Sequence, residues 1–190
     1  MPKARQHPQP VQRLAAGFTL IELLVTIGVL AVLAAMTIPS MIDFVRSARA
    51  NQLSGALVAT LRQGRNEAMK RNIGVLVCAN DGTNNCASST DWGVRGWLVC
   101  YAASSSSTCD SSTLELPNPI MIQGPQTTTT ALVAGPSTAI RFTPYGAQGS
   151  TTNVVLTITG TWANAIQLKV TVYPSGQVMG TRMTSQSTHT

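Results

Sequence analysis

One apolar segment near the start of the chain restricts its fold more than any other feature. Residues 18–38 (FTLIELLVTIGVLAVLAAMTI) contain a single charged residue, Glu22. As a helix, these 21 residues would be about 31 Å long, which is enough to cross the hydrocarbon core of a bilayer. Lys3, Arg5 and Arg13 precede the segment, and the positive-inside rule leaves such a basic start in the cytoplasm. The sequence therefore predicts a single membrane-spanning helix with its N-terminus inside and the C-terminus outside.

A secretory signal peptide is the alternative interpretation of this segment. Ala34 or Ala35 would supply the small residue of a cleavage site after the apolar run. The run is longer than usual for a signal peptide, however, and it contains Glu22. An acid inside a membrane helix costs roughly 2.5–3.5 kcal/mol. Its presence therefore requires a compensating interaction.

The positive charge of the chain is concentrated before residue 73. The formal net charge is +6, and the four basic residues from Ile73 onward are balanced by four acids. The remaining charge belongs to residues 1–17 and to a helix predicted over 39–72. A basic nucleic-acid-binding domain is therefore not indicated after residue 73.

Residues 39–72 have the pattern of an amphipathic helix that packs on a globular domain. Pro39 predicts a kink or a local opening, and the helix is expected to end near Arg71 and Asn72. The apolar residues that share one helical face are Ile42, Val45, Leu53, Leu57, Leu61 and Ala68.

Residues 73–190 have the pattern of a β-rich domain. Turn residues separate the apolar stretches. The predicted strands lie within residues 73–78, 92–101, 120–123, 131–133, 139–143, 154–159, 166–173 and 177–179.

The four cysteines predict disulfides and an oxidising compartment such as the periplasm. None belongs to a C-x-x-C pair, so the spacing of a zinc site is absent. Spacing favours the pairs Cys78–Cys86 and Cys100–Cys109, each closing a short loop, although four cysteines allow three pairings.

The sequence contains no recognisable catalytic constellation. His7 lies in the N-terminal segment and His189 next to the last residue, so neither is placed for acid–base chemistry. We therefore expect a non-enzyme without a cofactor or metal centre. Calcium binding by loop carboxylates is the alternative for the acids, which are Asp81, Asp91, Asp110 and Glu115.

The residues Gly17-Phe18-Thr19-Leu20-Ile21-Glu22 resemble the leader motif of type IV prepilins and type II secretion pseudopilins. The resemblance implies that a prepilin peptidase removes residues 1–17 by cutting between Gly17 and Phe18, and methylates the new amine of Phe18. It also implies that Glu22 pairs with the N-terminal amine of a neighbouring subunit during assembly. Such a pair would compensate the buried carboxylate.

Several later segments resemble the GspH/FimT family of minor pilins and pseudopilins. They are Cys78 with Cys86, Trp92 with Trp97, residues 140–146 and the pair Ser175-Gly176. The resemblance implies an α+β fold: a long helix, half transmembrane (18–38) and half amphipathic (39–72), packed on an antiparallel β head (73–190) of about two small sheets.

The same resemblance implies a structural role in initiating a type IV pilus or a type II secretion pseudopilus. The expected partners are other minor pilins or pseudopilins, the prepilin peptidase and an inner-membrane assembly platform. The expected location is the inner membrane, with the head in the periplasm, and later a filament.

Two alternative functions remain open from the sequence. Some FimT-type pilins bind DNA through a basic G-R-x-R motif, but the matching stretch here, residues 176–179, has Gln177 and Met179 in place of the arginines. Arg141, Lys169 and Arg182 would offer only a weak, salt-sensitive contact to phosphates, so nucleic acid is not the expected partner. The other alternative is a periplasmic binding module on an uncleaved anchor.

Overall fold

The computed structural model describes residues 17–102, 106–110, 117–126, 131–162 and 165–183, and omits the side chains of residues 36–40. Most of the predicted leader, together with His7, Glu115 and His189, therefore lies outside the described residues. The chain divides into two compact units, residues 1–42 and 43–190, which are described separately below.

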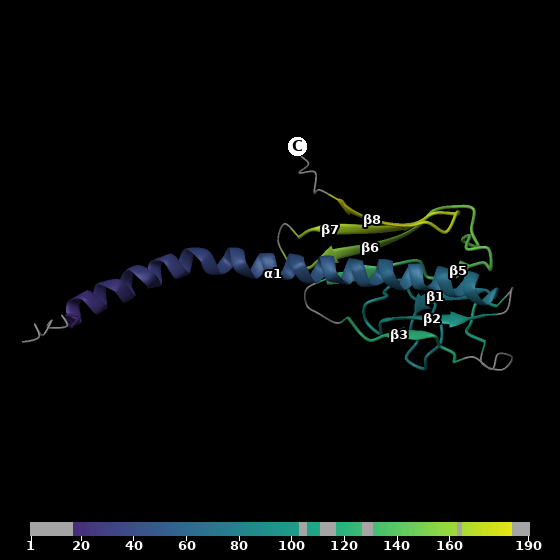
Figure 1. The fold of residues 1–190 in the computed structure, drawn as a ribbon, viewed down its shortest axis with the longest axis horizontal. Helices are drawn as coiled ribbons and strands as arrows, with labels where there is room; N and C mark the ends of the chain where they lie inside the picture. The colour runs from purple at the N-terminus through teal and green to yellow at the C-terminus, as the bar shows by residue number, and fades with distance from the viewer. Residues whose placement is uncertain (1–16, 103–105, 111–116, 127–130, 163–164, 184–190) are drawn as a thin grey trace, which may run out of the picture. The chain divides into compact units, whose positions relative to one another are not determined.

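Helix α1 runs from Leu20 to Arg71 (Figure 1). Its end has the hydrogen bond of a Schellman motif, from the amide of Ile73 to the carbonyl of Ala68 (3.2 Å). Asn72 adopts a left-handed conformation (φ 57°) between them, which an asparagine tolerates better than most residues. The helix thus ends where its sequence predicts. It continues through Pro39, so the predicted local opening is not observed.

The head contains two four-stranded antiparallel sheets, as predicted. The first has the order β3-β2-β1-β5 and the second the order β4-β6-β7-β8. The strands of the first sheet are β1 (Val75–Ala79), β2 (Trp97–Tyr101), β3 (Met121–Gln123) and β5 (Ile140–Phe142). Those of the second sheet are β4 (Ala131–Ala134), β6 (Val154–Gly160), β7 (Gln167–Val172) and β8 (Val178–Met183).

Two strands differ in length from the prediction by more than two residues. Strand β2 begins at Trp97 rather than at Trp92, because the carboxylate of Asp91 accepts the amide of Gly93 (2.8 Å) and makes a turn there. Gly96 then has φ +79°, and a side chain at this position would collide with the carbonyl of Gln123. Strand β8 extends four residues further than predicted, to Met183.

Residues 43–71 of α1 and the inner faces of both sheets share one apolar core. Leu57 and Leu61 of the helix are completely buried there. Gly64 allows the helix to pack tightly against β1, because an added Cβ would lie 2.8 Å from a methyl group of Val77. The largest buried side chains of the head are the aromatic residues Trp92, Trp97 and Phe142.

Arg65 connects this helix to two turns that belong to different sheets. Its Nε donates to the carbonyl of Gly146 (2.8 Å), in the turn after β5. Its guanidinium also donates to the carbonyl of Ser175 (3.4 Å), in the turn between β7 and β8. A side chain at Gly176 (φ +78°) would collide with the same Gly146 carbonyl, so the two turns touch.

Candidate assembly segment and surfaces of the head

The predicted cleavage position lies just before the first turn of α1. Thr19 caps the helix: its Oγ1 accepts the amide of Glu22 (3.3 Å), and its carbonyl accepts the amide of Leu23 (3.1 Å). Gly17 and Phe18 precede the cap and are exposed, with 81% of Phe18 accessible. The bond between them is therefore in a non-helical, accessible segment. The Thr-x-x-Glu spacing of a capping box is the signal that would have identified Thr19.

Glu22 occupies the third helical position, and its side chain is exposed. A carboxylate in the first turn of a helix interacts favourably with the partial positive charge of the helix terminus. Within the described part of the chain, Glu22 has no ion-pair partner, whereas Asp43 contacts Arg46 (3.4 Å) and Glu67 contacts Arg71 (3.8 Å). The carboxylate is therefore open to a cation from another source.

The helix surface after Phe18 is apolar on every side. All large hydrophobic side chains between Phe18 and Leu33 are exposed, from 55% to 81%. Such a surface requires an apolar environment that this segment does not supply by itself. Among the residues that the structure describes, no helix has the length and apolar character needed to span a bilayer. The predicted membrane segment, 18–38, includes residues whose side chains are not described, and it remains a prediction.

Both disulfides lie on the face of the first sheet that is turned away from α1. Cys78 is bonded to Cys86 and Cys100 to Cys109, with Cα–Cα distances of 5.4 and 5.5 Å. This is the pairing that the spacing favours. Cys78 on β1 and Cys100 on β2 belong to a small apolar cluster, separate from the main core, together with Leu76, Leu98 and Ala102.

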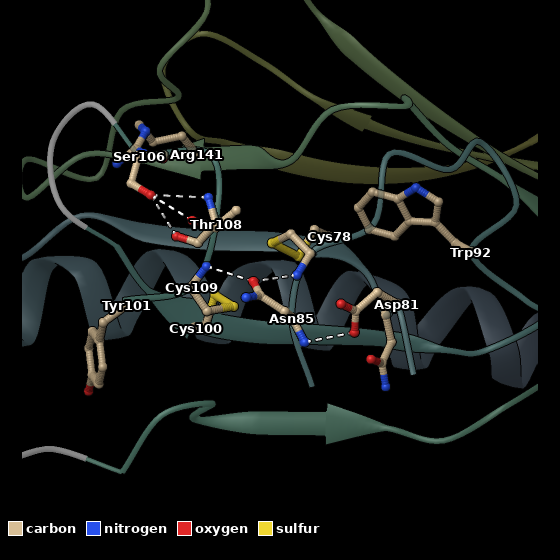
Figure 2. Close-up of a disulfide and its surroundings, with 12 residues drawn as sticks. Cys78, Asp81, Asn85, Trp92, Cys100, Tyr101, Ser106, Thr108, Cys109 and Arg141 are labelled. Carbon is tan, nitrogen blue, oxygen red and sulfur yellow. Dashed lines mark hydrogen bonds between the residues drawn. A yellow bond between two sulfur atoms is a disulfide. The ribbon is translucent and has the colours of Figure 1, made fainter. Parts of the chain in front are cut away.

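Asn85 joins the two disulfide-bonded loops (Figure 2). Its Oδ1 accepts the amides of Cys86 (2.8 Å) and Cys109 (2.9 Å). Asp81 organises the first loop, because its carboxylate accepts the hydroxyl and amide of Thr83 and the amide of Asn85. These hydrogen bonds, led by that of the Thr83 hydroxyl, lower the pKa of Asp81 below its ordinary value. The loops are thus held by polar contacts as well as by the disulfides.

The structure does not gather the loop acids into a cation site. The carboxylates of Asp81 and Asp91 bind the backbone of their own turns, Asp110 follows Cys109, and Glu115 lies outside the described residues. Within those residues, the only group with metal-ligand spacing consists of Cys86, Cys100 and Cys109, all of which are engaged in disulfides.

The three cations proposed for DNA contact lie in different places. Arg141 on β5 donates to the carbonyl of Ser106, and burial lowers its pKa from the ordinary value. In the register of the two strands, Lys169 on β7 lies opposite Thr181 of β8. Arg182 on β8 lies opposite the buried Leu168 of β7. Because neighbouring residues of a strand point to opposite faces, Lys169 and Arg182 lie on opposite sides of the second sheet.

Two family models match the chain. Residues 54–176 match the family described as type II transport protein GspH. Residues 12–38 match the prokaryotic N-terminal methylation motif.

Solved structures show the same fold. The chain is similar to the type IV minor pilin FimU of Pseudomonas aeruginosa strain PAO1 in two crystal forms, with TM-scores of 0.54 and 0.52 and 17% identity. Each match covers 72% of this chain, and 90% or 94% of the FimU chain. Among curated protein sequences, none matches significantly.

Proposed function

Because the chain belongs to the GspH family of pilin-like proteins, we propose that it is a minor pilin or pseudopilin that helps to initiate a filament. The family is one of structural subunits rather than enzymes, and membership implies assembly with other pilins. In this proposal a prepilin peptidase removes residues 1–17 and methylates Phe18.

The observation that carries the proposal is the arrangement of residues 17–22. An accessible Gly17–Phe18 bond lies immediately before a capped helix whose first half is apolar apart from Glu22, and that carboxylate has no ion-pair partner among the described residues. Cleavage before Phe18 would create a cationic amine at the start of the helix. In a bilayer, the carboxylate of one subunit and the amine of the next would stabilise each other while the apolar helices pack together. The N-terminal methylation motif over residues 12–38 supports this assignment.

The same proposal places the chain in the inner membrane before assembly. Residues 18–38 would cross the bilayer once with the N-terminus in the cytoplasm, and residues 73–190 would form the periplasmic head. Two disulfides in the head fit an oxidising compartment. An inner-membrane assembly platform would then transfer the subunit from the membrane to the filament.

Two kinds of machine are compatible with the relatives. GspH is described as a type II transport protein and FimU as a type IV minor pilin. Deleting the gene and measuring both protein secretion and pilus assembly distinguishes them. Loss of secretion alone assigns the chain to a pseudopilus, and loss of pili alone assigns it to a type IV pilus.

Replacing Glu22 tests the assembly mechanism. We expect Glu22→Ala to insert and be cleaved normally, but to enter filaments at least about tenfold less than the unchanged chain, because a lost pair of charges in a bilayer costs more than about 1.4 kcal/mol. Asp43→Ala is the matched control, since it removes an acid of the same helix whose partner is exposed. Equal incorporation of the Glu22→Ala chain would contradict the mechanism.

The mature N-terminus tests the processing step. Mass spectrometry of the protein from membranes that contain a prepilin peptidase should find a chain that starts at N-methylated Phe18. An intact Met1 would instead indicate a permanently anchored module.

A further inference from the structure

The outer strands of the two sheets differ in how their edges are covered. The edge of β5 is paired by residues 147–149, since the carbonyl of Arg141 accepts the amide of Gly149 (2.9 Å). The edge of β4 is paired by residues 90–92, since the carbonyl of Val133 accepts the amide of Trp92 (2.9 Å). Strand β8 pairs with β7 alone and lies at the outside of its sheet (Figure 1). Among the described residues, no strand pairs with its other edge.

The pairing with β7 shows which backbone groups of β8 face outward. The amide of Tyr173 donates to the carbonyl of Gln177 (2.9 Å), so this pair is hydrogen-bonded across the hairpin. Hydrogen-bonded and non-bonded pairs alternate along antiparallel strands. The residues whose amides and carbonyls point away from β7 are therefore Val178, Gly180 and Arg182. The carbonyl of Val178 indeed accepts a hydrogen bond from Arg62 of α1 (3.2 Å), which leaves Gly180 and Arg182 to offer donors and acceptors.

A groove of about 360 Å³ runs between this edge and α1. The helix contributes small residues there, Ser54 and Gly55, and the strand contributes Gly180. A Cβ added to Gly180 would lie 3.3 Å from a methyl group of Val58, so the backbone of the strand approaches the helix closely. The groove thus leaves room beside the free backbone groups for the side chains of another strand.

The two faces of β8 differ in chemistry. Arg62 and Arg182 line the groove on the inner face, and none of its described lining residues is acidic. On the outer face, Met179 and Met183 are each more than two fifths exposed (42% and 44%). A strand added beside β8 would alternate its side chains between these two faces. Acidic side chains would lie beside the arginines, and apolar side chains beside the methionines.

We propose that the free edge of β8 binds an extended segment of another polypeptide in which acidic and apolar residues alternate. Backbone hydrogen bonds supply the general affinity of such strand addition, and the side chains on alternate positions supply the specificity. A second copy of β8 does not fit this role, because it would bring a further arginine, its own Arg182, to the basic groove and no acid. The inference concerns the head alone and holds whether or not the chain enters a filament.

The test uses the full chain in nanodiscs and the peptide Thr-Glu-Val-Glu-Val-Glu-Thr, labelled with fluorescein at its N-terminus and amidated at its C-terminus, with binding followed by anisotropy. We expect saturable binding that Arg182→Gln weakens about tenfold. Arg182→Pro should weaken it further, because proline also removes an outward amide without removing a hydrogen bond to β7. Lys169→Gln is the matched control: it removes an equal charge from the opposite face of the same sheet and should change binding less than about twofold.

Three results would overturn the proposal. The first is no binding at millimolar peptide. The second is equal weakening by Lys169→Gln and Arg182→Gln, which would indicate attraction by net charge alone. The third is complete displacement of the peptide by an equimolar single-stranded oligothymidylate, which would indicate a site for phosphates instead. A peptide with lysine in place of glutamate should not bind.

Discussion

The two halves of α1 differ in what their apolar side chains contact. In residues 20–35, the large apolar side chains point in every direction, and all are exposed. In residues 43–71, the buried side chains form a single stripe that includes Leu53, Leu57, Leu61 and Ala68, and this stripe packs on both sheets. The charged residues of the second half lie largely outside the stripe.

This difference shows that apolar content alone does not determine how a helix is buried. An apolar stripe on one side of a helix can be covered by a single packing surface, and here the two sheets of the same chain form that surface. A helix that is apolar all round needs a surrounding apolar medium or several other helices. The apolar surface of the first half is therefore covered by none of the described residues, whereas the stripe of the second half is covered by the head.

Shortening one leucine in each half is the strongest test of this comparison. Leu57→Ala should lower the free energy of unfolding of the head by about 2–5 kcal/mol, because it leaves a cavity in the core. Leu30→Ala should change it by less than about 0.5 kcal/mol, because that side chain is 64% exposed. Urea unfolding of the detergent-solubilised chain, followed by tryptophan fluorescence, measures both. Equal losses would mean that the first half also contributes to the core.

Removing a disulfide tests whether the packing of residues 43–71 depends on the face of the first sheet that is turned away from the helix. For a loop with a separation of 8 residues, the loss of chain entropy predicts a destabilisation of about 2–3 kcal/mol for Cys78→Ala with Cys86→Ala. The pair Cys100→Ala and Cys109→Ala, with a separation of 9, should cost a similar amount. Tryptophan fluorescence of the native state should be unchanged in both, because Trp97 contacts the helix on the opposite face. A shifted native spectrum would show that the two faces are coupled.

Glycine replacements compare the two halves at the level of a single methyl group. Gly64→Ala should destabilise the head by about 1–3 kcal/mol, because the new Cβ would lie 2.8 Å from Val77 and overpack the core. Gly28→Ala meets no atom within 4 Å and gains helix propensity, so no loss is expected. Thermal melting of both variants under the same conditions should show a lower melting temperature for Gly64→Ala and no decrease for Gly28→Ala.

Acid should loosen the first disulfide-bonded loop, which Asp81 organises. The folded-state pKa of Asp81 is lowered, so its contribution is fully present above the ordinary value of 3.8 and is lost as the pH falls through the lower, folded value. The effect is small because Asp81 is only partly buried. The protection of the Asn85 amide against hydrogen exchange, taken relative to its intrinsic exchange rate at each pH, should fall from pH 5 downward in the natural chain and much less in Asp81→Asn. An equal acid response in both chains would assign the effect to another group.

The positions of the helix and strands were largely predictable, because they follow from the pattern of apolar and turn residues along short stretches of the chain. The change from an all-apolar to an amphipathic stretch separates the halves of α1, and all eight strands fall within or overlap the predicted stretches. Short spacing favoured the disulfide pairs that the structure shows.

Contacts between distant residues were not predictable in the same way. Helical spacing places Gly64 on the apolar face with Leu57, Leu61 and Ala68 and leaves Gly55 off it, but it does not show that Gly64 would lie against Val77 of β1. The order of strands in each sheet, and the opposite faces of Lys169 and Arg182, follow from pairing with partners far away in the chain. The last residues of β8 are polar or exposed and depend on β7 for their strand conformation.

The bridging position of Arg65 has a mechanical consequence. One side chain fastens a turn from each sheet to the same helical turn. A pull along the helix is thus transmitted to both sheets at once, and neither can slide past the other without breaking this link. The link consists of two hydrogen bonds, of 2.8 and 3.4 Å, so it adds to the resistance that the shared apolar core already supplies.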